Sequence, residues 1–144
     1  SKKIKYIGFI TNLDKHDESG SHWTSTFINI NYKSDSYGAY YYDSVARKTP
    51  VLINTFLNNI KQQCNKLYPK RQFVIKHNYK QHQYGNSECG IFSILYQIRW
   101  INYLYRNNNT LFKKIIESND LNDKNANFMR KSLYRPNFKQ LTKK

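Results

Sequence analysis

The fold is decided by the stretch Gln83-Tyr84-Gly85-Asn86-Ser87-Glu88-Cys89-Gly90-Ile91-Phe92-Ser93-Ile94. In this stretch a polar, turn-prone run changes abruptly to an apolar segment that continues to about Tyr105. Ser87 or Glu88 stands where a helix cap is expected. The pattern therefore predicts a long buried helix whose first turn holds Cys89.

Cys89 has two interpretations at this place. A helix N-terminus carries partial positive charge and unpaired N–H groups, so it stabilises a thiolate and offers donors to an oxyanion. Thiols placed in this way have pKa values lowered from ~8.5 to roughly 3.5–7.5. The alternative is a buried apolar thiol in a core helix. The second cysteine, Cys64, lies at the C-terminal end of a predicted helix, and we interpret it as structural.

Three polar residues upstream of Cys89 favour the catalytic interpretation. His22 stands at the entrance of a predicted strand over residues 22–30, and Asp43 lies at the end of another over 39–44. If these strands form a hairpin, the Asp43 carboxylate reaches the His22 imidazole and orients it. The loop before Cys89 adds Gln83 as an amide donor, with Gln81 as the other glutamine that this loop offers. His82 and Asp35 are the competing choices for base and acid, and Asp43 could instead cap a turn.

The order His22-Trp23, Asp43, Gln83 and Cys89-Gly90, with Gln83 six residues before Cys89, resembles the Ulp1/adenain-like cysteine proteases. The resemblance covers residues 4–105. It implies an α+β fold with a mixed, mainly antiparallel sheet packed against helices and the catalytic cysteine at the N-terminus of a central buried helix. It also implies a triad of His22, Asp43 and Cys89, with Gln83 in the oxyanion hole. Trp23 is expected to pack in the core behind the site.

The remaining patterns predict the element order βββαβααα. A first strand is expected over residues 5–11 and a fourth over 72–76. Between them a helix opens with Thr49 as N-cap and Pro50 at its first position, and Val51, Phe56, Leu57 and Ile60 form its apolar stripe. Two helices are expected after the central one, over residues 111–118, capped by Thr110, and 120–135.

The composition indicates one domain over residues 1–144, with residues 135–144 as a basic tail that we expect to be mobile. Hydrophobic residues make up 39% and aromatic residues 16% of the chain, enough for an aromatic core. No run is long enough for a membrane span, no Cys/His cluster has zinc spacing, and we expect no metal or cofactor. Two cysteines form no disulfide framework and favour a reducing compartment.

The net charge of +15, from 24 Lys and Arg against 9 Asp and Glu, favours non-specific attraction to nucleic acid. An AT-rich coding sequence would also produce this abundance of Lys, Asn, Ile and Tyr. Only 21 residues precede His22, whereas proteases of the resembled family usually have more structure there. Either the domain is minimal or a segment that shapes the substrate groove is missing.

The resemblance implies a cysteine endopeptidase that cleaves after small residues, of the Gly-Gly-X type. Within the family we favour a viral maturation protease that processes structural polyproteins in the virion or host cytoplasm, acting as a monomer. The first alternative is an isopeptidase that removes SUMO or another ubiquitin-like protein from its conjugates. The second is a basic nucleic-acid-binding module with an incidental cysteine.

Overall fold

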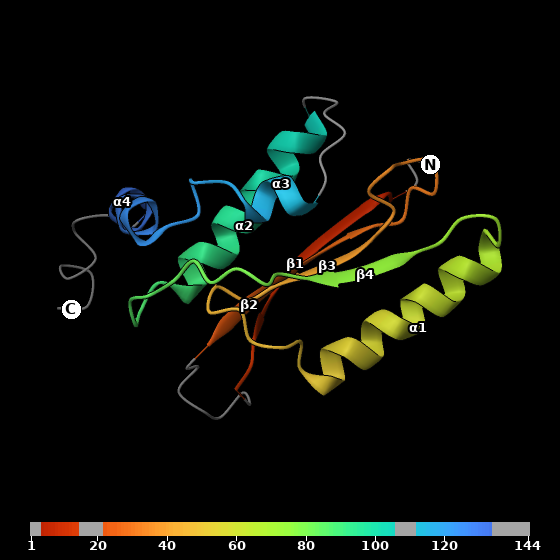
Figure 1. The fold of residues 1–144 in the computed structure, drawn as a ribbon, viewed down its shortest axis with the longest axis horizontal. Helices are drawn as coiled ribbons and strands as arrows, with labels where there is room; N and C mark the ends of the chain where they lie inside the picture. Colours follow the sequence, from red (N-terminus) through yellow and green to blue (C-terminus); the bar gives the residue numbers. More distant parts are fainter. Residues whose placement is uncertain (1–3, 15–21, 106–111, 134–144) are drawn as a thin grey trace, which may run out of the picture.

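The computed structural model describes residues 4–14, 22–105 and 112–133, and its elements follow the predicted order. These described segments contain four strands and four helices, whose arrangement can be followed in Figure 1. The strands are β1 (Tyr6–Asn12), β2 (Trp23–Asn29), β3 (Gly38–Tyr42) and β4 (Val74–His77). The helices are α1 (Val51–Leu67), α2 (Cys89–Tyr105), α3 (Phe112–Ile116) and α4 (Asp123–Leu133).

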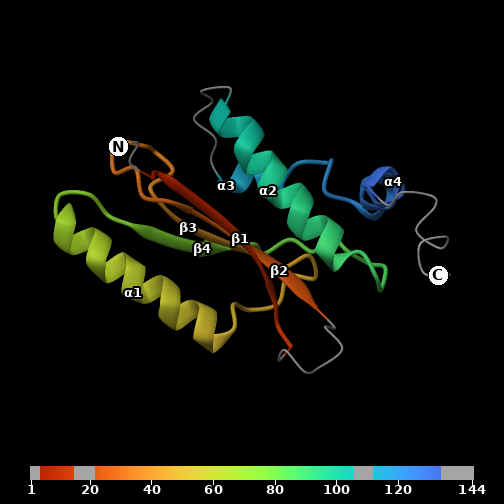
Figure 2. The ribbon, with the colours of Figure 1, turned by 180° about the vertical axis from the view of Figure 1, so that it is seen from behind.

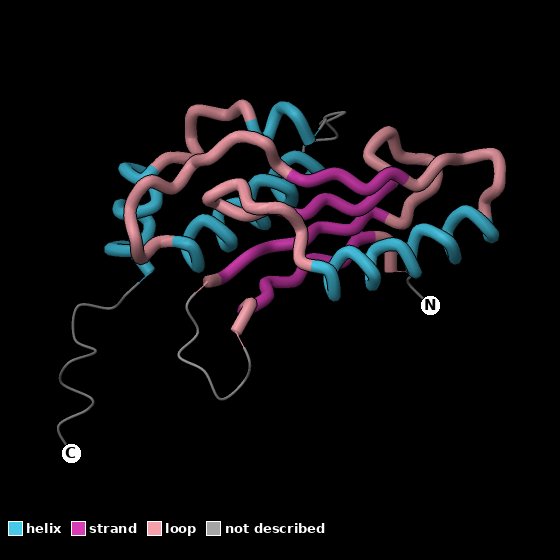
Figure 3. Tube along the Cα trace, turned by 60° about the horizontal axis from the view of Figure 1, so that its bottom comes forward, coloured by secondary structure: helices cyan, strands magenta, loops and turns pink. Residues whose placement is uncertain are grey.

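The strands form one sheet in the order β1-β2-β3-β4 (Figure 3). β1, β2 and β3 are antiparallel neighbours, and β4 joins β3 in parallel after the crossover through α1. The mixed, mainly antiparallel sheet is therefore confirmed. In the β2–β3 register Thr26 lies opposite Tyr41. His22 and Asp43, which flank these strands, consequently leave the sheet at the same end.

Helices cover the two faces of the sheet, and each face has its own core (Figures 1 and 2). Phe27 faces α2 while its neighbour Ile28 faces α1, as the alternation of side chains along a strand requires. Leu57 and Cys64 of α1 are buried in the second core. The first core, on the α2 side, is the larger and also takes up residues of α3 and α4.

Helix α1 corrects two predictions, one about where the helix starts and one about which of its residues are buried. It begins at Val51 with Pro50 in the N-cap position and without a side-chain cap, so Thr49 as N-cap is wrong. Pro50 is the N-cap residue, and its carbonyl accepts the first hydrogen bond of the helix, from the N–H of Asn54.

The inward stripe of α1 also differs from the expected one. Val51 is 80% and Phe56 50% exposed. The residues that pack against the sheet are Ile53, Leu57, Ile60 and Cys64, spaced by three or four positions.

Helix α2 is central and held mainly by aromatic packing. The ring of Trp100 stacks on Phe27 of β2, with ring centroids 4.5 Å apart, and Tyr96 stacks on Tyr42 of β3, also at 4.5 Å. Gln97 adds a polar connection, because its Nε2 donates to Ser25 Oγ at 2.7 Å. These contacts fix the axis of the helix that begins with Cys89.

The last two helices are shorter than expected. α3 ends at Ile116 and α4 spans Asp123–Leu133, with Asn119 to Asn122 in the turn between them. The predicted Thr110 cap and the basic tail over residues 135–144 lie outside the described residues. Among the described helices, none combines the length and the apolar character that crossing a membrane requires.

Candidate active site

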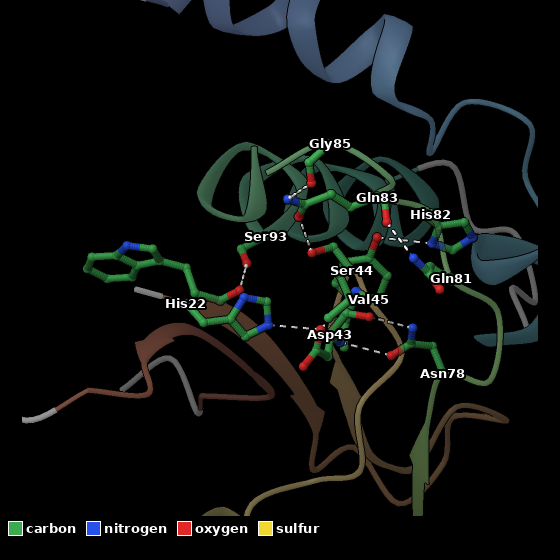
Figure 4. A network of polar contacts seen from close by, with 12 residues as sticks. His22, Asp43, Ser44, Val45, Asn78, Gln81, His82, Gln83, Gly85 and Ser93 are labelled. Carbon is green, nitrogen blue, oxygen red and sulfur yellow. Dashed lines mark hydrogen bonds and ion pairs between the residues drawn. The ribbon is translucent and has the colours of Figure 1, made fainter. Parts of the chain in front are cut away.

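His22 and Asp43 form a buried pair where β2 begins and β3 ends (Figure 4). The distance from His22 Nε2 to Asp43 Oδ1 is 2.9 Å. Asp43 is fully buried and His22 is 8% exposed. The structure thus brings together the two residues that the hairpin argument paired. Asp35, the competing acid, is exposed in the β2–β3 connection.

The Asp43 carboxylate is itself held by the backbone. Oδ1 also accepts the N–H of Val45 at 2.9 Å, and the Asp43 carbonyl accepts the N–H of Ala46 at 2.9 Å. This tight turn places Ala46 at a φ of 58°, a left-handed conformation that a residue with a Cβ adopts at some cost. The two local hydrogen bonds to Asp43 hold Ala46 in this conformation.

Asn78, which the sequence did not single out, locks the backbone of Asp43. Its Oδ1 accepts the Asp43 N–H at 2.9 Å, and its Nδ2 donates to the Asp43 carbonyl at 2.7 Å and to the Lys80 carbonyl at 3.0 Å. The side chain is fully buried. An Asn in a loop after a strand carries no local signal of such a role, because its partner lies 35 residues away.

These contacts assign the proton on the neutral His22 ring. An ionised carboxylate only accepts hydrogen bonds, so His22 Nε2 must carry the hydrogen in the contact with Asp43. The other ring nitrogen, Nδ1, then has a lone pair that can take a proton. Asp43 Oδ2 is buried without a hydrogen-bond partner among the described residues, so Oδ1 makes the hydrogen bonds that are seen to this carboxylate.

Cys89 is the first residue of α2, and the start of this helix is attached to the strand that follows His22. Ser93, one turn after Cys89 on the same helix face, donates from Oγ to the carbonyl of Trp23 at 3.2 Å. A Cβ on Gly90 would touch the Trp23 indole at 3.9 Å. Both contacts set the first turn of α2 against the beginning of β2, beside His22.

Trp23 corrects one prediction. Its side chain was expected in the core, but the residue is 39% exposed. The Trp23 indole lies against Gly90 at the start of α2, where a Cβ would be in ordinary van der Waals contact with it. Trp23 is therefore a partly exposed residue next to the first turn of α2.

Gln83 lies in the same buried region, and both the oxygen and the nitrogen of its side-chain amide are hydrogen-bonded (Figure 4). Its Oε1 accepts the hydroxyl of Ser44 at 2.6 Å, and its Nε2 donates to the Gly85 carbonyl at 2.7 Å. Gln83 is 3% exposed. An amide nitrogen has two hydrogens, and the bond to Gly85 uses one of them.

His82, the competing base, is buried, and both of its ring nitrogens are occupied by hydrogen bonds within the core. Its Nδ1 lies 3.0 Å from the Tyr42 hydroxyl and its Nε2 2.9 Å from the Ile116 carbonyl. The carbonyl only accepts, so Nε2 carries the hydrogen and Nδ1 accepts from Tyr42. Burial lowers the pKa of His82 below its ordinary 6.5. Of the other two histidines, His77 is exposed on β4, and His16 lies outside the described residues.

Helix α4 holds the loop that leads into Cys89. Asp123 accepts the N–H of Tyr84 through both carboxylate oxygens, at 3.0 and 3.3 Å. Arg130 donates to Ser87 Oγ at 3.0 Å and to Glu88 Oε1 at 3.3 Å. The hydroxyl of Ser87, and then Arg130, hold the pKa of Glu88 below its ordinary value. Glu88 therefore stays charged beside the start of α2.

The arrangement provides the parts of a thiol hydrolase. Cys89 begins a helix whose first turn contacts Trp23, the residue after His22. A buried carboxylate holds Nε2 of His22 and leaves Nδ1 able to accept a proton. Among the described residues, no group of three or more His, Cys, Asp or Glu is placed to hold a metal ion.

The comparisons with known proteins agree with this chemistry. The model of the Ulp1 protease family, C-terminal catalytic domain, matches residues 1–144. A protein of Acanthamoeba polyphaga mimivirus, R355, whose name describes a thiol protease, is 30% identical over 101 residues, which are 68% of this chain and 31% of that protein. The SUMO-1 cysteine protease S273R of African swine fever virus is 26% identical over 90 residues, covering 62% of this chain and 32% of the viral protein.

One solved structure gives the same picture of the fold. The crystal structure of the African swine fever virus pS273R protease matches with a TM-score of 0.65 at 22% identity, over 91% of this chain and 43% of that one. The chain spans about a third of the length of these curated relatives.

Proposed function

Because the chain belongs to the Ulp1 protease family, we propose that it is a cysteine protease in which Cys89 is the nucleophile and His22 the base. The observation that carries the proposal is the buried His22–Asp43 pair at 2.9 Å beside the helix that begins with Cys89. The roles of Asp43, as the group that orients His22, and of Gln83, as an oxyanion donor, complete the mechanism.

The first step is a proton transfer from the Cys89 thiol to His22 Nδ1. Asp43 holds Nε2–H, so Nδ1 is the nitrogen with a free lone pair, and the negative carboxylate stabilises the imidazolium that forms. The thiolate is stabilised in turn by the imidazolium and by the N-terminus of α2.

The thiolate then attacks the carbonyl carbon of the scissile bond, and the carbonyl oxygen becomes negative. The backbone N–H of Cys89 and the second N–H of Gln83 Nε2 are the donors for this oxygen. The C–N bond breaks as the imidazolium protonates the leaving amine. Water, deprotonated by His22, hydrolyses the thioester and returns the thiol.

The burial of the site supports a preference for a narrow substrate segment. Cys89 and His22 are each 8% exposed and Gln83 is 3% exposed, so a bulky residue beside the scissile bond would meet protein atoms. We infer cleavage after small residues, of the Gly-Gly-X type. The viral relatives favour processing of viral structural polyproteins, in the virion or host cytoplasm, as the biological role. Removal of a ubiquitin-like protein, as the name of the swine fever virus enzyme indicates for that protein, is the second candidate.

The proposal is tested by hydrolysis of Gly-Gly-X peptides and of ubiquitin-like conjugates, with products identified by mass spectrometry. Cys89→Ala should lower hydrolysis at least about 10³-fold, since the nucleophile is lost. In parallel, iodoacetamide at about pH 6 should label Cys89 rapidly in the wild type and slowly in His22→Ala.

Cys64→Ala is the matched control, because Cys64 is the other free thiol and lies buried against the opposite face of the sheet. It should keep both hydrolysis and labelling. Hydrolysis that survives Cys89→Ala would refute Cys89 as the nucleophile. Labelling of Cys89 by a ubiquitin-like C-terminal probe would favour the deconjugase, and its absence with peptide cleavage intact would favour polyprotein processing.

The net charge of +15 supports a further, weaker proposal, a non-specific attraction to nucleic acid. It should appear as DNA retention that falls steeply with salt and persists in Cys89→Ala. Retention that does not respond to salt would contradict it.

A further inference from the structure

Ser44 connects the His22–Asp43 pair with Gln83. It follows Asp43, which binds His22, and its own hydroxyl donates to Gln83 Oε1 at 2.6 Å. Ser44 is 1% exposed and Gln83 3%, so water does not compete for this bond. The contact joins residues 39 positions apart.

The backbone of Ser44 reinforces the contact. Its carbonyl accepts the N–H of His82 at 2.9 Å and the N–H of Gln83 at 3.0 Å. Gln83 is thus held by Ser44 through both its main chain and its side chain. A shift of Ser44 would move the amide of Gln83 together with the carboxylate that orients His22.

The hydrogen bonds also decide which way the Gln83 amide points. The Gly85 carbonyl only accepts, so the atom that meets it at 2.7 Å must be Nε2. Oε1 then faces Ser44, and the hydroxyl has to donate to it. In this orientation the remaining hydrogen of Nε2 is the one that can reach a substrate oxygen. The opposite orientation would set two oxygens, Oε1 and the Gly85 carbonyl, against each other.

We infer that Ser44 is a positioning residue for the oxyanion hole: it holds the Gln83 amide in the orientation that offers an N–H to the reacting carbonyl. The inference rests on the proposed function, in which Gln83 is an oxyanion donor. Without the hydroxyl, Oε1 is left buried without a donor, and the amide turns or shifts to find one. Ser44 itself touches no reacting atom.

The test compares hydrolysis with alkylation in Ser44→Ala. Hydrolysis of a Gly-Gly-X peptide passes through an oxyanion, and we expect kcat to fall roughly 10- to 100-fold with KM little changed, less than the ~10²–10³-fold typical of losing an oxyanion donor. Alkylation of Cys89 by iodoacetamide is a displacement at carbon that forms no oxyanion. Its rate should stay within about twofold of the wild type, because the thiolate and His22 are untouched.

A double-mutant cycle separates positioning from a general loss of structure. Ser44→Ala added to Gln83→Ala should lower kcat less than about twofold further, since the group that Ser44 holds is already gone. Ser36→Ala is the matched control, because Ser36 is also buried and accepts from Asn29 Nδ2 at 2.8 Å in the β2–β3 connection. It should leave kcat unchanged, and thermal unfolding of all variants sets the temperature of the assays.

Three results would overturn the inference. Unchanged kcat in Ser44→Ala, with a fall in Gln83→Ala, would remove Ser44 from the oxyanion hole and leave the protease assignment intact. An equal fall in kcat and in alkylation would mean that Ser44 acts through His22 and Cys89. Hydrolysis that survives Cys89→Ala would refute the proposed function, and the inference with it.

Discussion

At the scale of single residues, Asp43 makes more contacts in the site than its position at the end of a strand suggests. One oxygen, Oδ1, binds both the His22 ring and the Val45 N–H. Because a backbone N–H only donates, the atom at this position has to be an acceptor. The geometry thus separates two tasks of Asp43, orientation of the ring and supply of negative charge.

This separation predicts the effect of Asp43→Asn. The Val45 N–H should keep the asparagine oxygen toward His22, so the ring retains its orientation and loses only the charge. A hydrogen bond to a charged acceptor contributes about 1 kcal/mol more than one to a neutral acceptor. We expect kcat/KM to fall about five- to tenfold, and at least about 100-fold in Asp43→Ala, where the ring has no acceptor. A loss near 10⁴-fold in Asp43→Asn would mean that its amide nitrogen has turned to the ring.

At the scale of elements, the site depends on two helices in different ways. α2 presents Cys89 and is fixed through its length by stacked aromatic rings. α4 contributes no reacting group, but Asp123 and Arg130 hold the two ends of the 84–88 loop. Cys89 is therefore followed in the chain by a helix fixed through aromatic packing. It is preceded by a loop that Asp123 and Arg130 hold from the surface.

Arg130→Ala tests the contribution of α4. The Arg130 side chain is 43% exposed, so its ion pair with Glu88 should add less than about 1 kcal/mol to the free energy of unfolding. The loop before Cys89 should nevertheless shift, and we expect kcat to fall about three- to tenfold. Steady-state kinetics and thermal unfolding measure the two effects.

Lys131→Ala removes the same charge from the neighbouring exposed position of α4 and is the control for a purely electrostatic effect. It should leave kcat unchanged. If both variants lower kcat equally, the net charge of α4 and not the contact with Ser87 and Glu88 is responsible.

At the scale of the whole molecule, His82 connects the sheet to α3 as a neutral group. Its pKa is lowered, so between that pKa and 6.5 the unfolded chain binds more protons than the folded one. The stability that neutral His82 provides is present above pH 6.5 and is lost as the pH falls through the folded pKa. Each unit of lowering corresponds to about 1.4 kcal/mol.

We therefore expect the free energy of unfolding to decrease from about pH 7 to about pH 5, measured by denaturant titration. His82→Gln, which keeps a donor for Ile116 and an acceptor for Tyr42, should flatten this dependence. His77→Gln, on exposed β4, is the control and should leave it unchanged. The carboxyl of Glu88 titrates below this range, because its pKa is lowered from 4.5. An equally steep decrease in His82→Gln would assign the acid sensitivity to another group.

The sequence by itself determined the order of the elements and the helix whose first turn holds Cys89, because these follow from local alternation, helical spacing and turn residues. The mixed sheet was implied by the family resemblance. The sequence also indicated which histidine and carboxylate would meet, since a hairpin brings its own ends together. Only the tertiary structure decided the contacts of Ser44, Asn78 and Arg130, the exposure of Trp23 and the inward face of α1. Each depends on what another part of the chain packs against it, and a partner more than 30 residues away leaves no local pattern in the sequence.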